Sequence, residues 1–117
     1  MSNLADEKIV LSKKGDPAMD AADVQAMLDK VPGWKIIQDD GSDKLEREFE
    51  FRDYLMLIDL CHKIGCIAEQ ENHHPEMHIQ WGKLTVTWWT HVTGGLQRND
   101  FIMAARCNRA AMLISAP

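Results

Sequence analysis

The sequence predicts an α+β fold in which a four-stranded, mainly antiparallel sheet carries three helices packed on one face. Apolar residues recur at helical spacing in three segments and alternate in two paired stretches, in the order α-β-β-α-β-β-α. A chain of 117 residues is long enough for one compact domain and too short for two ordinary ones. We therefore expect a single domain over residues 16–117, preceded by a variable N-terminal segment over residues 1–15.

The first helix is expected between an early aspartate and a Pro-Gly stop. Asp16 before Pro17, or Asp20 a few residues later, is a candidate for its start. Pro32-Gly33 ends the helical pattern, whose apolar stripe consists of Val24, Met27, Leu28 and Val31.

The next two stretches predict a β-hairpin. Apolar and polar residues alternate on either side of a turn at 39–42, which reads Asp-Asp-Gly-Ser. The positions expected to face inward are Ile37, Leu45 and Phe49.

A central helix follows, with Asp53 as its expected N-cap. Pro75 disfavours the helical conformation at His74, so the helix is expected to end between Asn72 and His74. The histidine pair therefore lies at a corner between a helix and a strand. The apolar stripe of this helix consists of Leu57, Leu60, Cys61, Ile64, Ile67 and Ala68.

The last two predicted strands form a second hairpin that turns near Gly82. Alternation places Leu84, Val86 and Trp88 on one face and Thr85, Thr87, Trp89 and His91 on the other, with His91 at the end of the last strand. A closing helix over 96–115 is expected to bury Phe101, Ala104, Ala105, Ala111 and Met112.

Composition excludes several classes of protein. The formal net charge is −5, which argues against direct nucleic-acid binding, because phosphate recognition needs a surplus of lysine and arginine on one face. The N-terminal residues contain no apolar run that would suit a signal peptide or a membrane span. Three cysteines without CxxC spacing fit a reducing compartment. We therefore expect a cytoplasmic protein that binds neither membranes nor nucleic acid.

The stretch "ENHHPEMHIQW" contains three of the five histidines. His73 and His74 lie at the predicted corner and point in different directions, while His91 returns at the end of the neighbouring strand, so the three imidazoles can converge on one cleft. Glu69, one helical turn before His73, and Asp100, at the start of the last helix, are each able to fix the tautomer of a histidine.

Metal binding and proton transfer are the two kinds of chemistry that this histidine cluster could support. Metal binding is suggested by the four-residue spacing of His74 and His78, but Pro75 lies between them, so they do not share a helix face. Proton transfer demands less geometry, because imidazole titrates near ~6.5 and two histidines can serve as acid and base in one cleft. Proton transfer without a metal is the favoured interpretation.

The sequence resembles the pterin-4a-carbinolamine dehydratases over about residues 20–115. The resemblance rests on separated positions with their spacings: Glu69-x3-His73-His74-Pro75, then Trp81, Thr90-His91, Gly95-Leu96, Arg98 and Asp100. The order of predicted elements also agrees with that family's four-stranded sheet and three helices. Met77 and Trp88-Trp89 depart from some relatives, so the aromatic lining of the cleft is expected to differ.

The resemblance implies a lyase that removes water from a 4a-hydroxytetrahydropterin to give quinonoid dihydropterin, in tetrahydropterin recycling. It implies catalytic roles for His73, His74 and His91, orienting or electrostatic roles for Glu69 and Asp100, and no cofactor, since the pterin is the substrate. It also implies a homodimer or homotetramer; a partner-binding dimerisation cofactor without catalysis is the alternative. Substrate contacts implied by the resemblance are Asn72, His73, His74, Pro75, Trp89, Thr90, His91 and Val92.

Overall fold

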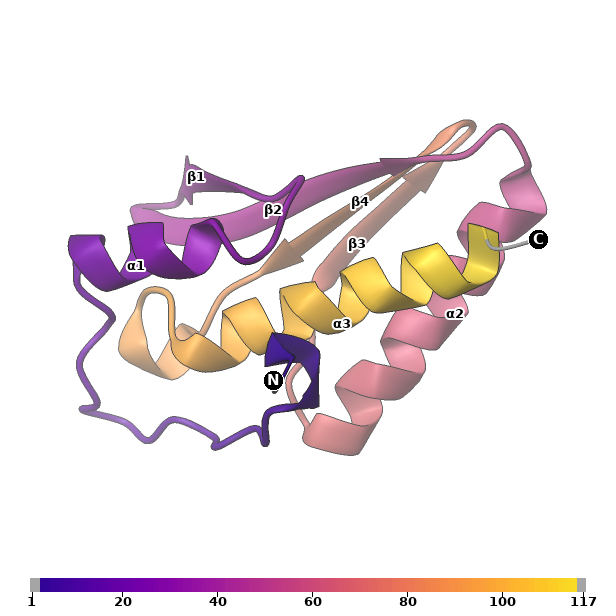
Figure 1. The fold of residues 1–117 in the computed structure, drawn as a ribbon. Coiled ribbons are helices and arrows are strands. Elements are labelled where there is room, and N and C mark those ends of the chain that lie inside the picture. The colour runs from indigo at the N-terminus through magenta and orange to yellow at the C-terminus, as the bar shows by residue number, and fades with distance from the viewer. Residues whose placement is uncertain (1–2, 116–117) are drawn as a thin grey trace.

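The computed structural model describes residues 3–115 and has the predicted order of elements (Figure 1). Two one-turn 3₁₀ helices accompany the main elements: η1 near the N-terminus and η2 after the last strand. The bounds are η1 Leu4–Asp6, α1 Ala21–Leu28, β1 Lys35–Asp39, β2 Ser42–Glu50, α2 Tyr54–Glu71, β3 Glu76–Gln80, β4 Lys83–Trp88, η2 His91–Thr93 and α3 Arg98–Ser115.

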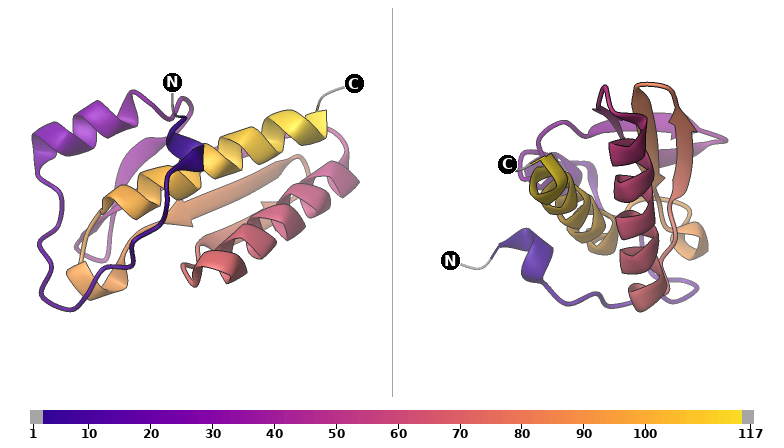
Figure 2. Two further views of the ribbon diagram at one scale, coloured as in Figure 1. Left: turned by 60° about the horizontal axis from the view of Figure 1, so that its bottom comes forward. Right: turned by 90° about the vertical axis from the view of Figure 1, so that its right-hand side faces the viewer.

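The four strands form one sheet in the order β1-β2-β4-β3, and every neighbouring pair is antiparallel. The long helices α2 and α3 lie side by side on one face of this sheet, and α1 covers the end near β1 and β2 (Figures 1 and 2). The predicted α+β architecture, with its helices on one face, is therefore confirmed. No helix within residues 3–115 combines the length and apolar character needed to cross a bilayer.

Side-chain caps fix where the helices begin. Asp20, and not Asp16, starts α1, because its carboxylate accepts the backbone N–H of Asp23 at 2.8 Å. Asp53 starts α2 as expected and accepts the N–H of Leu55. α2 ends with Asn72 in the left-handed conformation at φ 52°, within the range predicted from Pro75.

Three predictions from periodicity are wrong in detail. Ile36, which pairs with buried Leu45, packs against the core, whereas Ile37 pairs with Lys44 on the other face of the sheet. Met112 is 72% exposed, because it lies one residue beyond the buried Ala111 on the outer side of α3. His91 does not end the last strand: β4 stops at Trp88, and His91 opens the 3₁₀ turn that follows.

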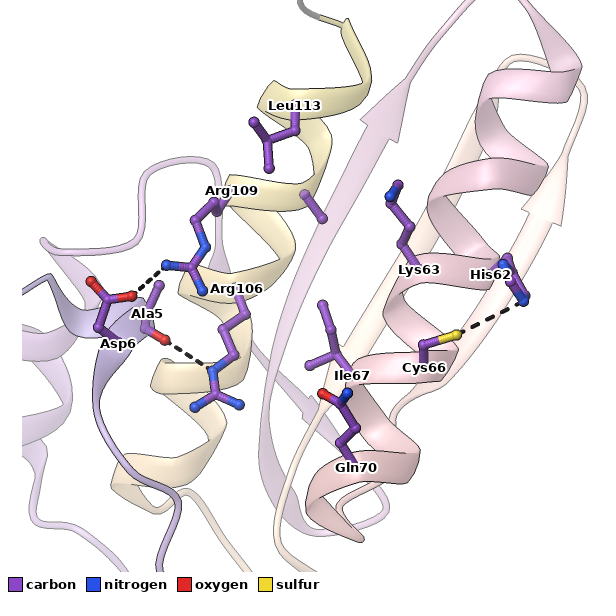
Figure 3. Close-up of a pocket in the computed structure, with 11 residues that line it drawn as sticks. Ala5, Asp6, His62, Lys63, Cys66, Ile67, Gln70, Arg106, Arg109 and Leu113 are labelled. Carbon is purple, nitrogen blue, oxygen red and sulfur yellow. Dashed lines mark hydrogen bonds and ion pairs between the residues drawn. The ribbon is translucent and has the colours of Figure 1, made fainter.

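The N-terminal residues pack along α3 before the chain reaches α1. Arg106 donates to the backbone carbonyls of Ala5 and Glu7, and Arg109 binds the carboxylate of Asp6 at 2.6 Å (Figure 3). Leu4 and Ala5 are buried against this helix. This segment is therefore part of the folded unit.

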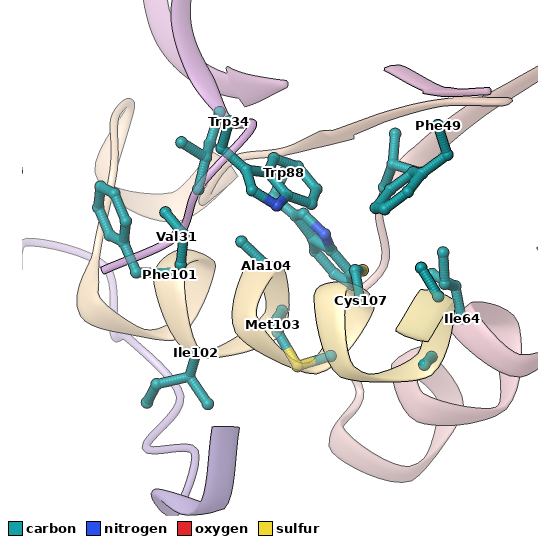
Figure 4. Close-up of a cluster of buried hydrophobic side chains, with 14 of the residues drawn as sticks. Val31, Trp34, Phe49, Ile64, Trp88, Phe101, Ile102, Met103, Ala104 and Cys107 are labelled. Carbon is teal, nitrogen blue, oxygen red and sulfur yellow. The ribbon is translucent and has the colours of Figure 1, made fainter. Parts of the chain in front are cut away.

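The hydrophobic core lies between the sheet and the two long helices (Figure 4). Trp88 at the end of β4 is fully buried and is the largest such side chain. Burial of large apolar side chains is the main favourable contribution to folding. Because Trp88 directly precedes the residues that lead to His91, the core also fixes the starting point of that loop.

Candidate active site

A cavity of about 500 Å³ opens where the end of α2, the loop after β4 and the start of α3 meet. Its volume is in the range of small-molecule sites. All three predicted catalytic histidines line it, so they do converge on one cleft. Its lining residues are Leu11, Ser12, Asn72, His73, His74, Trp89, Thr90, His91, Val92 and Asn99.

A hydrogen bond with Asp100 holds His73 in place. The Nε2 atom of His73 lies 2.7 Å from Oδ1 of Asp100, whose side chain is completely buried. The other carboxylate oxygen accepts the Thr90 hydroxyl at 2.8 Å and the Gln97 backbone N–H at 2.9 Å. Since a carboxylate accepts, Nε2 of His73 carries the proton, and Nδ1 is the nitrogen free to exchange one.

The ring of His73 is also fixed by stacking. Its centroid lies 5.3 Å from that of Trp88, with an angle of 28° between the planes. Trp88 belongs to the core, so the orientation of His73 is set by the same packing that stabilises the fold. His73 is thereby held by a hydrogen bond on its edge and by an aromatic ring on its face.

His74 points the other way, toward α2 and solvent. Its Nε2 lies 2.6 Å from Glu69, but the side chains of His74 and Glu69 are 53% and 80% exposed. The left-handed residue Asn72 reverses the chain at this point, which sends the two adjacent histidines to different sides. Both predicted carboxylates therefore bind a histidine, one each.

His91 is held by an indole and not by a carboxylate. Nε1 of Trp89 donates to Nδ1 of His91 at 3.3 Å, and the two rings lie 4.7 Å apart. The ammonium group of Lys44 lies 3.9 Å above the Trp89 ring, in a cation–π contact. Because Nδ1 accepts this hydrogen bond, the neutral ring carries its proton on Nε2.

The implied substrate contacts agree with the cavity lining except at one residue. Pro75 does not line the cavity, because it directs the chain from the corner into β3. Three lining residues were not predicted: Leu11, Ser12 and Asn99. Asn99 adjoins Asp100 and was open to prediction from that neighbour, whereas no spacing connects the N-terminal pair with the histidines.

His78, the third histidine of the stretch at residues 71–81, does not line this cavity. His78 is on β3, where it binds Glu76 at 2.9 Å in an exposed position outside the cavity. The spacing between His74 and His78 therefore does not bring them together at this site. Within residues 3–115, no group of three or more histidine, cysteine, aspartate and glutamate side chains is arranged to hold a metal ion.

A second cavity, of about 610 Å³, lies between α2, α3 and η1 (Figure 3). Both arginines of its lining bind carboxylates: Arg106 binds Glu71 and Arg109 binds Asp6. Its cysteine, Cys66, is exposed beside His62. This cavity thus lacks the oriented, partly buried acid–base groups of the first, which we take as the candidate active site.

The buried cysteine offers no alternative nucleophile. Cys107 is completely buried within α3, and desolvation raises the pKa of its thiol to about 12. The thiol is therefore protonated at neutral pH and remains a small core side chain.

Comparison with known proteins agrees with the resemblance seen in the sequence. The chain matches the family model described as Pterin 4 alpha carbinolamine dehydratase over residues 17–110. A protein of Marinobacter nauticus named "Putative pterin-4-alpha-carbinolamine dehydratase" is 42% identical over 106 residues, which cover 91% of this chain and 96% of that protein. A protein of Chlorobaculum tepidum with the same name is 37% identical over 109 residues, covering 93% and 98% of the two chains.

A solved structure is similar as well. The crystal structure described as transcriptional coactivator/pterin dehydratase from Brucella melitensis matches with a TM-score of 0.73 at 26% identity, and covers 80% of this chain and 98% of that chain. The region matched by the family model includes His73, His74, His91 and Asp100. The chain therefore belongs to the pterin 4 alpha carbinolamine dehydratase family.

Proposed function

We propose that this protein removes water from a 4a-hydroxytetrahydropterin by histidine acid–base catalysis. The observation that carries the proposal is the convergence of His73, His74 and His91 on one cavity, each oriented by a different partner. Membership of the family supplies the substrate class.

The reaction requires two proton movements. The bond between C4a and the hydroxyl oxygen breaks as that oxygen receives a proton and leaves as water. The proton on N5 departs as the double bond between C4a and N5 forms. The products are quinonoid dihydropterin and water, with no change in oxidation state, so a positioned acid and a positioned base are sufficient.

The orientation of each ring suggests its role. The Nδ1 atoms of His73 and His74 are free of the carboxylates that bind Nε2, so these two histidines exchange protons through Nδ1. A neutral His91 has Nδ1 occupied by Trp89 and presents Nε2–H as a hydrogen-bond donor. We assign proton exchange through Nδ1 to His73 and His74, and donation of the Nε2 proton to the pterin to His91.

Rapid-mixing absorbance of 4a-hydroxytetrahydropterin decay, in a buffer with a strong chelator, tests the proposal. The wild-type protein should accelerate the decay above its uncatalysed rate. His73→Ala and His91→Ala should each lower turnover by roughly 10²-fold or more, the scale of lost acid–base catalysis. His78→Ala is the matched control, because this exposed histidine binds a carboxylate outside the cavity. Full turnover in both cavity variants would exclude the mechanism.

Partner binding is a second candidate function, favoured by the description of the Brucella melitensis protein as a transcriptional coactivator. Such a role does not depend on proton transfer. A His73→Ala protein that has lost turnover but retains a partner in the cell would support it, whereas a fully active enzyme without partners would leave dehydration as the function.

A further inference from the structure

The chain before α1 crosses the mouth of the candidate active site. We define residues 3–19 as the N-terminal strap. Within it, Leu11 and Ser12 line the same cavity as the three histidines. The family model matches residues 17–110, so Leu11 and Ser12 lie outside the segment that this model describes.

The strap is held firmly on the side that precedes these two residues. Asn99 of α3, which is itself buried, accepts the backbone N–H of Val10 and donates to its carbonyl. Glu7 binds Arg98 through both carboxylate oxygens, each at 2.8 Å. These hydrogen bonds come from the same turn of α3 that carries Asp100, so one helix end positions both the strap and His73.

The strap is held again on the side that follows. The Gln97 side chain donates to the carbonyl of Pro17 at 2.6 Å, and the N–H of Met19 donates to Leu96 at 3.0 Å. The approach is close: a Cβ added to Gly95 would lie 3.1 Å from the Cβ of Ala18. Leu11 and Ser12 therefore line the cavity between two stretches that are hydrogen-bonded to the rest of the fold, one at Val10 and one at residues 17–19.

The three walls of the cavity differ in chemistry. The histidines occupy two walls, at the corner after α2 and in the loop after β4. The strap contributes no titratable side chain to the lining, and its Leu11 is an apolar side chain that is 48% exposed. A ligand that covered Leu11 would gain the free energy of burying apolar surface.

We propose that Leu11 and Ser12 of the strap form a substrate-binding wall and that Leu11 packs against the side chain carried by the pterin at C6. This inference rests on the proposed function. The reacting atoms C4a and N5 must face the histidines, and C6 is bonded directly to N5, so its substituent leaves the ring beside the reacting atoms. The pyrimidine edge of the pterin is polar and suits hydrogen-bonding groups. The carbon atoms of the substituent at C6 instead suit an apolar contact with Leu11.

The test compares Leu11→Ala with Val10→Ala. The two positions are adjacent, but the Val10 side chain is 74% exposed and does not line the cavity, and its backbone hydrogen bonds to Asn99 survive the substitution. The substrates are the 4a-hydroxytetrahydropterins with a dihydroxypropyl and with a methyl group at C6. Leu11→Ala should raise KM about 3- to 10-fold for the longer side chain, less for the methyl compound, and leave kcat unchanged. Val10→Ala should match the wild type.

Binding of an unreactive ligand separates this inference from the proposed function. Calorimetry with a 7,8-dihydropterin that carries the dihydroxypropyl group measures the contact without turnover. Weaker binding in Leu11→Ala than in Val10→Ala supports the contact even if the wild type catalyses nothing. Equal binding, or a loss of kcat that is the same for both substrates, overturns it even if the enzyme is active. A wild type that neither binds nor reacts overturns both.

Discussion

The two carboxylate–histidine pairs of the cavity have nearly equal lengths and opposite surroundings. His73 and Asp100 are 2.7 Å apart with 11% and 0% of their side chains exposed, whereas His74 and Glu69 are 2.6 Å apart with 53% and 80% exposed. Water competes for hydrogen bonds and screens charge at the second pair but hardly at the first. Equal geometry therefore does not imply equal importance, and substitutions should affect the two pairs very differently.

The buried pair should give the largest effect. Asp100→Asn leaves one acceptor oxygen for the Thr90 hydroxyl, the Gln97 N–H and His73. Its N–H₂ group finds an acceptor only if the Thr90 hydroxyl or Nε2 of His73 reverses its hydrogen bond. We expect the free energy of unfolding to fall by about 1–3 kcal/mol, the cost of leaving a buried group unsatisfied. Turnover should fall by roughly 10²-fold, because the orientation of His73 is lost.

Urea unfolding and rapid-mixing kinetics on the same protein would measure both quantities. Asp59→Asn is the matched control, since Asp59 lies exposed on α2 outside the cavity. If Asp100→Asn lost stability but kept its turnover and pH profile, Asp100 would hold the loop and helix together without positioning His73.

An intermediate effect is expected at His91. Trp89→Phe keeps an aromatic ring beside Lys44 but removes the N–H that His91 accepts. One hydrogen bond is worth about 0.5–1.5 kcal/mol net, so kcat/KM should fall about 2- to 10-fold. Trp81→Phe is the control, because Trp81 is 81% exposed at the β3–β4 turn and does not line the cavity. Equal kcat/KM in Trp89→Phe and the wild type would show that Trp89 does not position His91.

The sequence alone was sufficient for the architecture and for most of the cavity. Period and turn residues predict every helix and strand of the main fold. The expected places of His73 and His74 at the corner after the central helix, and of His91 at the end of the neighbouring strand, predict their convergence. Both Glu69 and Asp100 were predicted as partners, but not which histidine each would bind. Glu69 precedes His73 by one helical turn, yet the left-handed turn at Asn72 leaves His74 on its side and turns His73 toward Asp100.

The place of Leu11 in the cavity and the turn at His91 depend on contacts between residues that are distant in the sequence or that follow no periodic pattern. Leu11 reaches the cavity because Asn99 binds the backbone of Val10, and backbone hydrogen bonds leave no signature in the identity of the residue bound. Alternation continues through Trp89 and therefore predicts His91 at the end of a strand, whereas β4 ends at Trp88. The first segment is held by its hydrogen bonds with α3, whereas the turn at His91 is closed by the bridge between Thr90 and Gly95.

The smallest effect is expected at the exposed pair. Glu69→Gln keeps an oxygen that accepts from His74 and removes a charge that solvent already screens, so we expect kcat/KM to change by about 5-fold or less and the free energy of unfolding not to change measurably. Glu76→Gln is the matched control, since Glu76 binds the exposed His78 outside the cavity in the same way. A loss in Glu69→Gln as large as in Asp100→Asn would mean that bound substrate covers the exposed pair. The difference in burial between the two histidines would then disappear when substrate binds, and His74 would become the principal proton-transfer group.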